Sequence, residues 1–300
     1  MAQLAKRVGQ ALILRYALGV ERTPFDVIEP PDGSASPVLV EVPHAGLWLD
    51  APAATFCTAP VHCLAYDADL YVDELFQDAP SLGATLIRAN VSRFFVDLNR
   101  AADDYDGAAV EGGPSVERPR GVIWRVTSDG SEVLRERLPR AEYERRIATI
   151  HRPYHDEVRR LLTEKRAEFG FAVLLCGHSM PTPRPRHRGA TPPDVVPGTR
   201  GRTSAGPPWI EIVESAALER GWRVQHDIPY RGGYGTTYYG RPREHWHAVQ
   251  IELARRLYMN ETTLQKGPRD FEFVRDFARD VVRRTVRRSL EGAARRNAAQ

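Results

Sequence analysis

The sequence predicts an α/β fold in which a mostly parallel or mixed central sheet is flanked by helices. Short apolar segments alternate with segments of helical periodicity along most of the 300 residues. The segments 37–43 and 171–176 are mostly apolar, as expected for strands covered on both faces. Hydrophobic residues make up 42% and charged residues 27% of the chain, which is typical of a globular protein. Ligands of such sheets bind at the carboxyl ends of the strands.

The N-terminal part predicts a helical extension, residues 1–36, followed by the first strand. The Pro-, Gly- and Ser-rich stretch EPPDGSAS (29–36) predicts a turn that ends this extension. The strand 37–43 then runs into the turn Pro43-His44-Ala45-Gly46. His44 therefore stands just beyond the carboxyl end of a buried strand.

A helix and two strands are expected next. Residues 71–79 place apolar side chains at helical spacing, and Asp67 and Asp69 precede them. The segments 84–89 and 93–98 have the composition of strands. The segment that follows, 101–137, is rich in Gly, Asp and Pro, which predicts a long loop with a short hairpin.

The remaining elements complete the alternation. A long helix is expected over 139–168, with a kink at Pro153. The strand 171–176 ends at Gly177-His178. A helix is expected over 208–221 and a strand over 222–227. The segment 247–259 fits either a strand or a helix, and a closing helix is expected after about residue 268.

Several classes of protein are not expected. No segment approaches the roughly 18 uninterrupted apolar residues of a membrane span. The apolar run 11–14 stops at Arg15 and has no small-residue cleavage site, so a secretory signal is not expected. Cys57, Cys63 and Cys176 are scattered and odd in number, which argues against a disulfide framework. We expect a cytoplasmic protein.

Arginine gathers in two places, although the net charge is only +3. One cluster, 184–188, lies in the segment 180–193, and the other spans 281–296. The second is typical of the solvated face of a terminal helix. Neither cluster is accompanied by aromatic residues or a nucleic-acid motif, so a protein associated with nucleic acid is the least favoured class. The oligomeric state is not predictable.

Two histidines at equivalent strand ends suggest a metal site. His44 and His178 each lie beside a small residue, and either Asp67 or Asp69 could complete a set of three ligands. Two imidazoles, one carboxylate and a water form a common catalytic zinc site. The aspartates could equally serve as helix N-caps, and His44 as a turn residue.

Glu252 is the candidate general base. It lies between Ile251 and Leu253, where an unpaired buried charge would be unfavourable. Alternatively it faces solvent or pairs with Arg255 or Arg256.

The segment SRFFVDLNR suggests a site for a substrate carboxylate. Arg93, Asp97 and Asn99 would share one face of the predicted strand, and Arg100 would lie at its turn. The planar guanidinium group suits a carboxylate, and Asn can complete that contact. We expect Asp97 to hold an arginine in place, and surface ion pairing is the alternative.

Taken together, these segments resemble the N-formylglutamate amidohydrolase family from about Pro37 to Asn260. The resemblance rests on their order and spacing: VEVPHAG, DADLYVDEL, GATLIRANVSRFFVDLNR, RPYH, LLCGHSM, PGTRGRTS, PYRGGYGTTYYGRP and HAVQIELARRLYM. It implies a fold similar to zinc carboxypeptidases and aspartoacylases. It also implies zinc-dependent hydrolysis of an N-acyl amino acid that carries a carboxylate, with N-formyl-L-glutamate as the best candidate.

Roles for individual residues follow from this resemblance. It implies His44, Asp69 and His178 as ligands of Zn2+ or another divalent transition metal, with Asp67 as the alternative to Asp69. Glu252 would be the general base and acid. Arg93, Asn99 and Arg100 would bind the substrate carboxylate. On this basis residues 37–265 form the amidohydrolase domain, and 266–300 a basic helix packed on it or extending from it.

The segments 180–193 and 266–300 do not match the family pattern. Because 180–193 follows His178, it could change the choice of substrate. A zinc amidase acting on another N-acyl amino acid, a peptide, a cell-wall fragment or a formylated natural product is therefore the alternative.

Overall fold

A computed structural model describes residues 23–182 and 191–297. The predicted helix at the start of the N-terminal extension and most of the Arg-rich segment 180–193 lie outside these residues. Among the described residues, no helix has the length and apolar character needed to cross a membrane.

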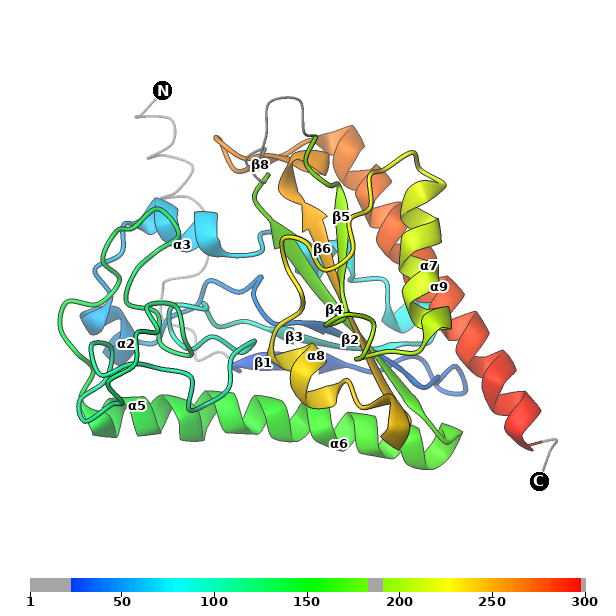
Figure 1. The fold of residues 1–300 in the computed structure, drawn as a ribbon, viewed down its shortest axis with the longest axis horizontal. Coiled ribbons are helices and arrows are strands. Elements are labelled where there is room, and N and C mark those ends of the chain that lie inside the picture. Colours follow the sequence, from blue (N-terminus) through cyan, green and yellow to red (C-terminus); the bar gives the residue numbers. More distant parts are fainter. Residues whose placement is uncertain (1–22, 183–190, 298–300) are drawn as a thin grey trace. The chain divides into compact units, whose positions relative to one another are not determined.

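The described residues contain a six-stranded sheet with strand order β1-β3-β2-β4-β6-β5 (Figure 1). Strand β4 is parallel to both of its neighbours, β2 and β6, whereas β5 is antiparallel to β6. The predicted mixed sheet flanked by helices is therefore confirmed. The strands are β1 (Phe25–Ile28), β2 (Val38–Val42), β3 (Thr85–Ala89), β4 (Ala172–Met180), β5 (Val195–Gly198) and β6 (Trp246–Ala254), and a separate hairpin joins β7 (Met259–Asn260) and β8 (Gln265–Lys266).

The chain forms two compact units. The loop unit comprises Met1–Asp26, Pro43–Leu70 and Arg88–Glu157. The sheet unit comprises Val27–Val42, Tyr71–Ile87 and Val158–Gln300. Whether residues 37–265 act as one domain, as the sequence suggests, stays a prediction.

In the sheet unit, fully buried strands are covered by helices. All side chains of β2 and β4 are buried, and α7 and α9 lie side by side (Figure 1). Gly177 of β4 faces Phe76, and a Cβ atom at this position would come within 2.7 Å of the Phe76 ring. The helices of this unit are α4 (Val72–Leu75), η1 (Pro80–Leu82), most of α6 (Arg152–Phe169), α7 (Pro207–Leu218), α8 (Tyr234–Tyr239), η3 (Pro242–Glu244), η4 (Arg255–Leu257) and α9 (Pro268–Asn297).

The loop unit has less regular structure. Its helices are α2 (Ala51–Phe56), α3 (Val61–Asp67), α5 (Arg140–Arg146) and a π-helical turn, η2 (Ile147–His151), which leads into α6. This irregularity precedes Pro153, which cannot donate a backbone hydrogen bond. The kink expected at Pro153 stays a prediction. Residues 101–137 form a long loop with isolated bridges, also as predicted.

Some predicted elements are wrong. Residues 93–98 form turns rather than a strand, because Ser92 Oγ accepts a hydrogen bond from Phe94 N and Asp97 Oδ1 accepts one from Asn99 N. The predicted shared strand face of Arg93, Asp97 and Asn99 is therefore also wrong. Residues 222–227 make only a single bridge, through Val224.

Other boundaries shift. The helix expected over 71–79 is limited to α4, and residues 25–28 form β1 within the predicted helical extension. The ambiguous segment 247–259 begins as strand β6, so Glu252 lies on a strand. Strand β4 continues to Met180, so His178 lies within the strand rather than beyond its end.

Helix α9 is fastened to the sheet unit by Asp78. Its carboxylate accepts hydrogen bonds from Arg275 Nε at 2.9 Å, Arg275 Nη2 at 3.0 Å and Arg279 Nε at 2.6 Å. Burial works against the charged form, but the two arginines outweigh it and lower the pKa of Asp78. The contact is thus strongest when Asp78 is ionised.

We expect Asp78→Asn to lower the free energy of unfolding by about 1–2 kcal/mol at neutral pH, because charge-assisted hydrogen bonds are lost. Since the folded-state pKa is depressed, this contribution is present above the unfolded pKa of about 4 and is lost as the pH falls through the folded value. Urea unfolding at several pH values measures it. The exposed Glu272, which pairs with Arg275 at 3.5 Å, provides the control Glu272→Gln. A constant difference between Asp78→Asn and the unaltered protein down to pH values well below 4 would contradict the assignment.

Candidate active site

His44 follows β2 in the loop unit and is oriented by a buried carboxylate. Its side chain is only 2% exposed, and Nε2 lies 2.8 Å from Asp97 Oδ1. Asp97 is ionised, so Nε2 carries the proton and donates it. The other ring nitrogen, Nδ1, then offers a lone pair, and it lies 3.5 Å from Asp69 Oδ2. A carboxylate that fixes the tautomer of a histidine in this way is typical of metal-ligating histidines.

Asp97 itself is fully buried, and hydrogen bonds compensate its charge. Oδ2 accepts from Arg93 Nη2 at 2.9 Å and from Trp124 Nε1 at 2.9 Å, and Oδ1 also accepts from Asn99 N at 2.8 Å. Burial alone would raise the pKa of Asp97, but His44 and Arg93 hold it well below the usual range. The prediction that Asp97 holds an arginine is confirmed. Its contact with His44 was not predicted.

The two candidate aspartates have different surroundings. Asp69 is 2% exposed, its carboxylate faces His44, and its backbone N–H donates to His44 O at 2.9 Å. Asp67 instead accepts hydrogen bonds from Ser128 N and Ser128 Oγ. Asp67 therefore ties a distant loop to the end of α3, whereas Asp69 lies beside the histidine.

The two candidate arginines also differ. Arg93 donates to Asp97 through Nε and Nη2 and to Asp67 O through Nη1, and its guanidinium lies 4.5 Å from the Trp124 ring centroid. These contacts use three of its five N–H groups. The Arg100 side chain is 45% exposed and has a longer contact of 3.8 Å with Asp104. Arg100 is therefore the more accessible cation.

In the sheet unit, His178 and Glu252 are neighbours on adjacent strands. The parallel register pairs His178 of β4 with Glu252 of β6, so their side chains share one face of the sheet. They are 3% and 5% exposed. A solvent-facing Glu252, the alternative left open by the sequence, is thereby excluded.

Gln250 was missed by the sequence reasoning and contacts Glu252 directly. Gln250 Nε2 donates to Glu252 Oε1 at 2.7 Å, and Gln250 Oε1 accepts from Gly233 N at 2.9 Å. It thus links the glycine-rich segment around Gly233 to the glutamate. The sequence did contain a signal for this contact: Gln250 and Glu252 are two positions apart, and on a strand such residues point to the same side.

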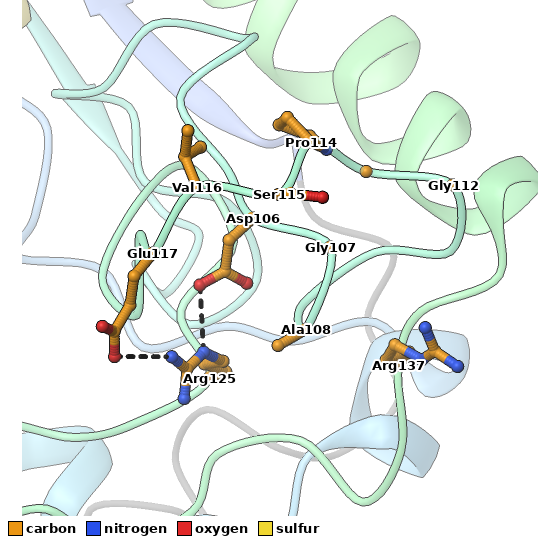
Figure 2. Close-up of a pocket in the computed structure, with 11 residues that line it drawn as sticks. Asp106, Gly107, Ala108, Gly112, Pro114, Ser115, Val116, Glu117, Arg125 and Arg137 are labelled. Carbon is orange, nitrogen blue, oxygen red and sulfur yellow. Dashed lines mark hydrogen bonds and ion pairs between the residues drawn. The ribbon is translucent and has the colours of Figure 1, made fainter.

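A pocket of about 490 Å³ in the loop unit lies among other residues (Figure 2). Arg125 in its lining forms ion pairs with two carboxylates, Asp106 at 3.1 Å and Glu117 at 3.3 Å. None of the predicted catalytic, metal-binding or substrate-binding residues lines it. Three of its charged residues, Asp106, Glu117 and Arg125, already pair with one another, so the pocket gives no independent indication of a ligand.

Buried imidazole and carboxylate groups near the strand ends of an α/β sheet are typical of an enzyme that uses acid–base or metal chemistry. The family model for N-formylglutamate amidohydrolase matches residues 36–259. The chain belongs to the N-formylglutamate amidohydrolase family.

Curated relatives and a solved structure agree with this membership. The chain is 34% identical to an N-formylglutamate deformylase of Pseudomonas putida and 32% identical to one of Pseudomonas aeruginosa, in each case over 75% of this chain and 83% of the relative. The crystal structure of an N-formylglutamate amidohydrolase from Ralstonia eutropha JMP134 superposes with a TM-score of 0.83 and 28% identity, covering 90% of this chain and 100% of that one.

Proposed function

We propose that this protein hydrolyses N-formyl-L-glutamate to L-glutamate and formate as a zinc-dependent amidohydrolase. The observation that carries this proposal is the family match over residues 36–259, a range that contains every proposed catalytic, metal-binding and substrate-binding residue. Cys57, Cys63 and Cys176 are all free thiols, which fits the proposed cytoplasmic location.

His44, Asp69 and His178 are the proposed metal ligands. All three are buried, and each offers one ligand atom. The register of β2 and β4 pairs Glu41 with Cys176, and His44 and His178 follow these residues by only a few positions. That the three residues share one metal ion is part of the proposal, and it follows from the family pattern. The orientation of His44 by Asp97 also suits a metal, because it turns Nδ1 toward the side of the ring where the Asp69 carboxylate lies.

Zn2+ bound there would polarise the formyl carbonyl and make a water molecule more acidic. Glu252 would accept the proton of the attacking water and deliver it to the departing amine nitrogen. Gln250 donates to one carboxylate oxygen of Glu252. This contact holds the Glu252 carboxylate in a fixed orientation on β6.

Arg100, with Asn99 and Arg93, is proposed to bind a substrate carboxylate. Arg100 is exposed enough to reach a ligand. Arg93 uses three N–H groups in its contacts with Asp97 and Asp67, and its other two N–H groups could donate to a substrate carboxylate. A guanidinium group and a carboxylate form a bidentate ion pair that orients as well as binds.

We expect Arg100→Ala chiefly to raise KM for N-formyl-L-glutamate, because uniform binding is lost while the reacting groups remain. The loss of a charged hydrogen-bonding partner corresponds to about 10- to 100-fold in kcat/KM. Steady-state kinetics measures it, with the exposed Arg140 providing the control Arg140→Ala. Unaltered KM and kcat in Arg100→Ala would exclude this role.

The proposed substrate is tested by formate release from N-formyl-L-glutamate, measured beside N-acetyl-L-aspartate and larger N-acyl amides, with metal analysis of the same protein. Preference for N-formyl-L-glutamate and loss of activity on chelation support the proposal. Preference for a larger amide would favour the alternative amidase motivated by segment 180–193.

The structure gives no support to nucleic-acid binding through α9. Arg275 and Arg279 pair with Asp78, and Arg284 pairs with Glu219 and Asp280. The positive charge of these three arginines is therefore balanced within the chain.

A further inference from the structure

The loop unit holds a second group of metal-ligating side chains, composed of His62, Cys63 and Asp129. His62 and Cys63 lie in the first turn of α3, and Asp129 comes from the loop 127–131. Cys63 is buried, while His62 and Asp129 are exposed. The proposed hydrolysis uses none of them.

Their spacing matches the ligands of a tetrahedral metal. Cys63 Sγ lies 3.4 Å from His62 Nε2 and 3.7 Å from Asp129 Oδ2. One ligand atom of each residue lies within 4.8 Å of the others. Zinc binds sulfur at about 2.3 Å and nitrogen or oxygen at about 2.1 Å, so neighbouring ligands at the tetrahedral angle lie about 3.6 Å apart. Both sulfur distances agree with this spacing.

The carboxylate of Asp129 is held in position by its own loop. Oδ1 accepts hydrogen bonds from Thr127 Oγ1 and from Ser131 N, which leaves Oδ2 directed at the sulfur. Hydrogen bonds of this kind orient the carboxylate ligands of metals.

The loop is also fastened to α3, which carries the other two ligands. Ser128, next to Asp129, donates both its backbone N–H and its hydroxyl group to Asp67 at the end of that helix. The three ligands are therefore brought together by contacts that do not depend on a metal.

The local charge favours a cation. The Cys63 thiol donates a hydrogen bond to Asp129 Oδ2, and Asp67 lies at the end of the same helix, so two carboxylates place negative charge near the sulfur. The same negative potential attracts a divalent cation, which would replace the thiol proton and release it to solvent.

We propose that His62, Cys63 and Asp129 bind a thiophilic divalent cation of the Zn2+ class, with water completing the coordination. Sulfur, imidazole and carboxylate together suit zinc better than calcium or magnesium, which prefer oxygen ligands alone. The bound ion would join α3 to the loop 127–131.

Cobalt and zinc titrations of the full-length protein test this site. Co2+ bound by a thiolate gives a sulfur-to-metal charge-transfer band in the near ultraviolet, which Zn2+ then displaces. We expect the band in the unaltered protein and in the control Cys57→Ser. We expect Cys63→Ser to lose both the band and one equivalent of bound zinc. Because the proposed hydrolytic ligands include no sulfur, the result is independent of the proposed function.

Two further variants distinguish loss of metal binding from a folding defect in Cys63→Ser. His62→Ala removes an exposed ligand and should also abolish the stoichiometric band. Thr127→Val removes a hydrogen bond to Asp129 and should weaken zinc binding by about 10- to 100-fold. Absence of the band in the unaltered protein, or its persistence in Cys63→Ser, would overturn the proposal.

Discussion

Glu252→Gln is expected to reduce kcat for N-formyl-L-glutamate by about 10²- to 10⁴-fold, the usual contribution of a general acid–base group. Glutamine has nearly the same shape but cannot accept and return a proton. Its side chain can still take the hydrogen bond that Gln250 donates to Glu252 at 2.7 Å, so strand β6 should remain in place. Metal content should stay unchanged, because Glu252 is not a proposed ligand.

The measurement combines steady-state kinetics with metal analysis of the same preparation. Glu244 precedes β6, is 52% exposed and pairs with Arg241, so Glu244→Gln is a matched control with the same chemical change. Full turnover in Glu252→Gln would exclude the acid–base role. Loss of metal in that variant would instead make Glu252 a ligand.

Asp97→Asn is expected to weaken metal binding by about 10- to 100-fold, because Asp97 fixes the ring orientation of His44. It should also destabilise the fold. Asp97 is fully buried and Arg93 only 17% exposed, so the substitution leaves a largely buried guanidinium without its counter-charge. Breaking one side of a buried ion pair costs about 3–5 kcal/mol.

Chelator competition measures the first effect, and urea unfolding of the metal-free protein measures the second. Glu117→Gln removes an 83% exposed carboxylate of the same loop unit and serves as the control. Exposed ion pairs contribute about 0–1 kcal/mol, so this control should change little. Unchanged metal affinity in Asp97→Asn would show that its bond to His44 serves folding alone.

The sheet was predictable where strands are buried on both faces. The continuous apolar pattern of β2 and β4 distinguishes them from the amphipathic helices. Residues 93–98 have an equally apolar pattern, yet they form turns, because the Ser92 and Asp97 side chains bond to nearby backbone N–H groups. Periodicity does not reveal this competition between side chain and backbone.

The chemical groups of the candidate site were predictable, but their supporting contacts were less so. His44, Asp69, His178 and Glu252 stand out as residue types with chemical roles in family-like segments. The bond from His44 to Asp97 joins residues 53 positions apart, and the bond from Trp124 to Asp97 comes from within a long loop. Such contacts depend on a loop conformation that no local pattern encodes.

The register of the sheet also has a consequence for synthesis. Val38 of β2 pairs with Val173 of β4, which the ribosome adds more than a hundred residues later. At about 5–20 residues per second, β2 waits on the order of 10 s for its partner. During that interval an apolar strand with unsatisfied backbone groups is available to wrong partners. The nascent chain therefore passes through a period in which mispairing and aggregation compete with completion of the sheet.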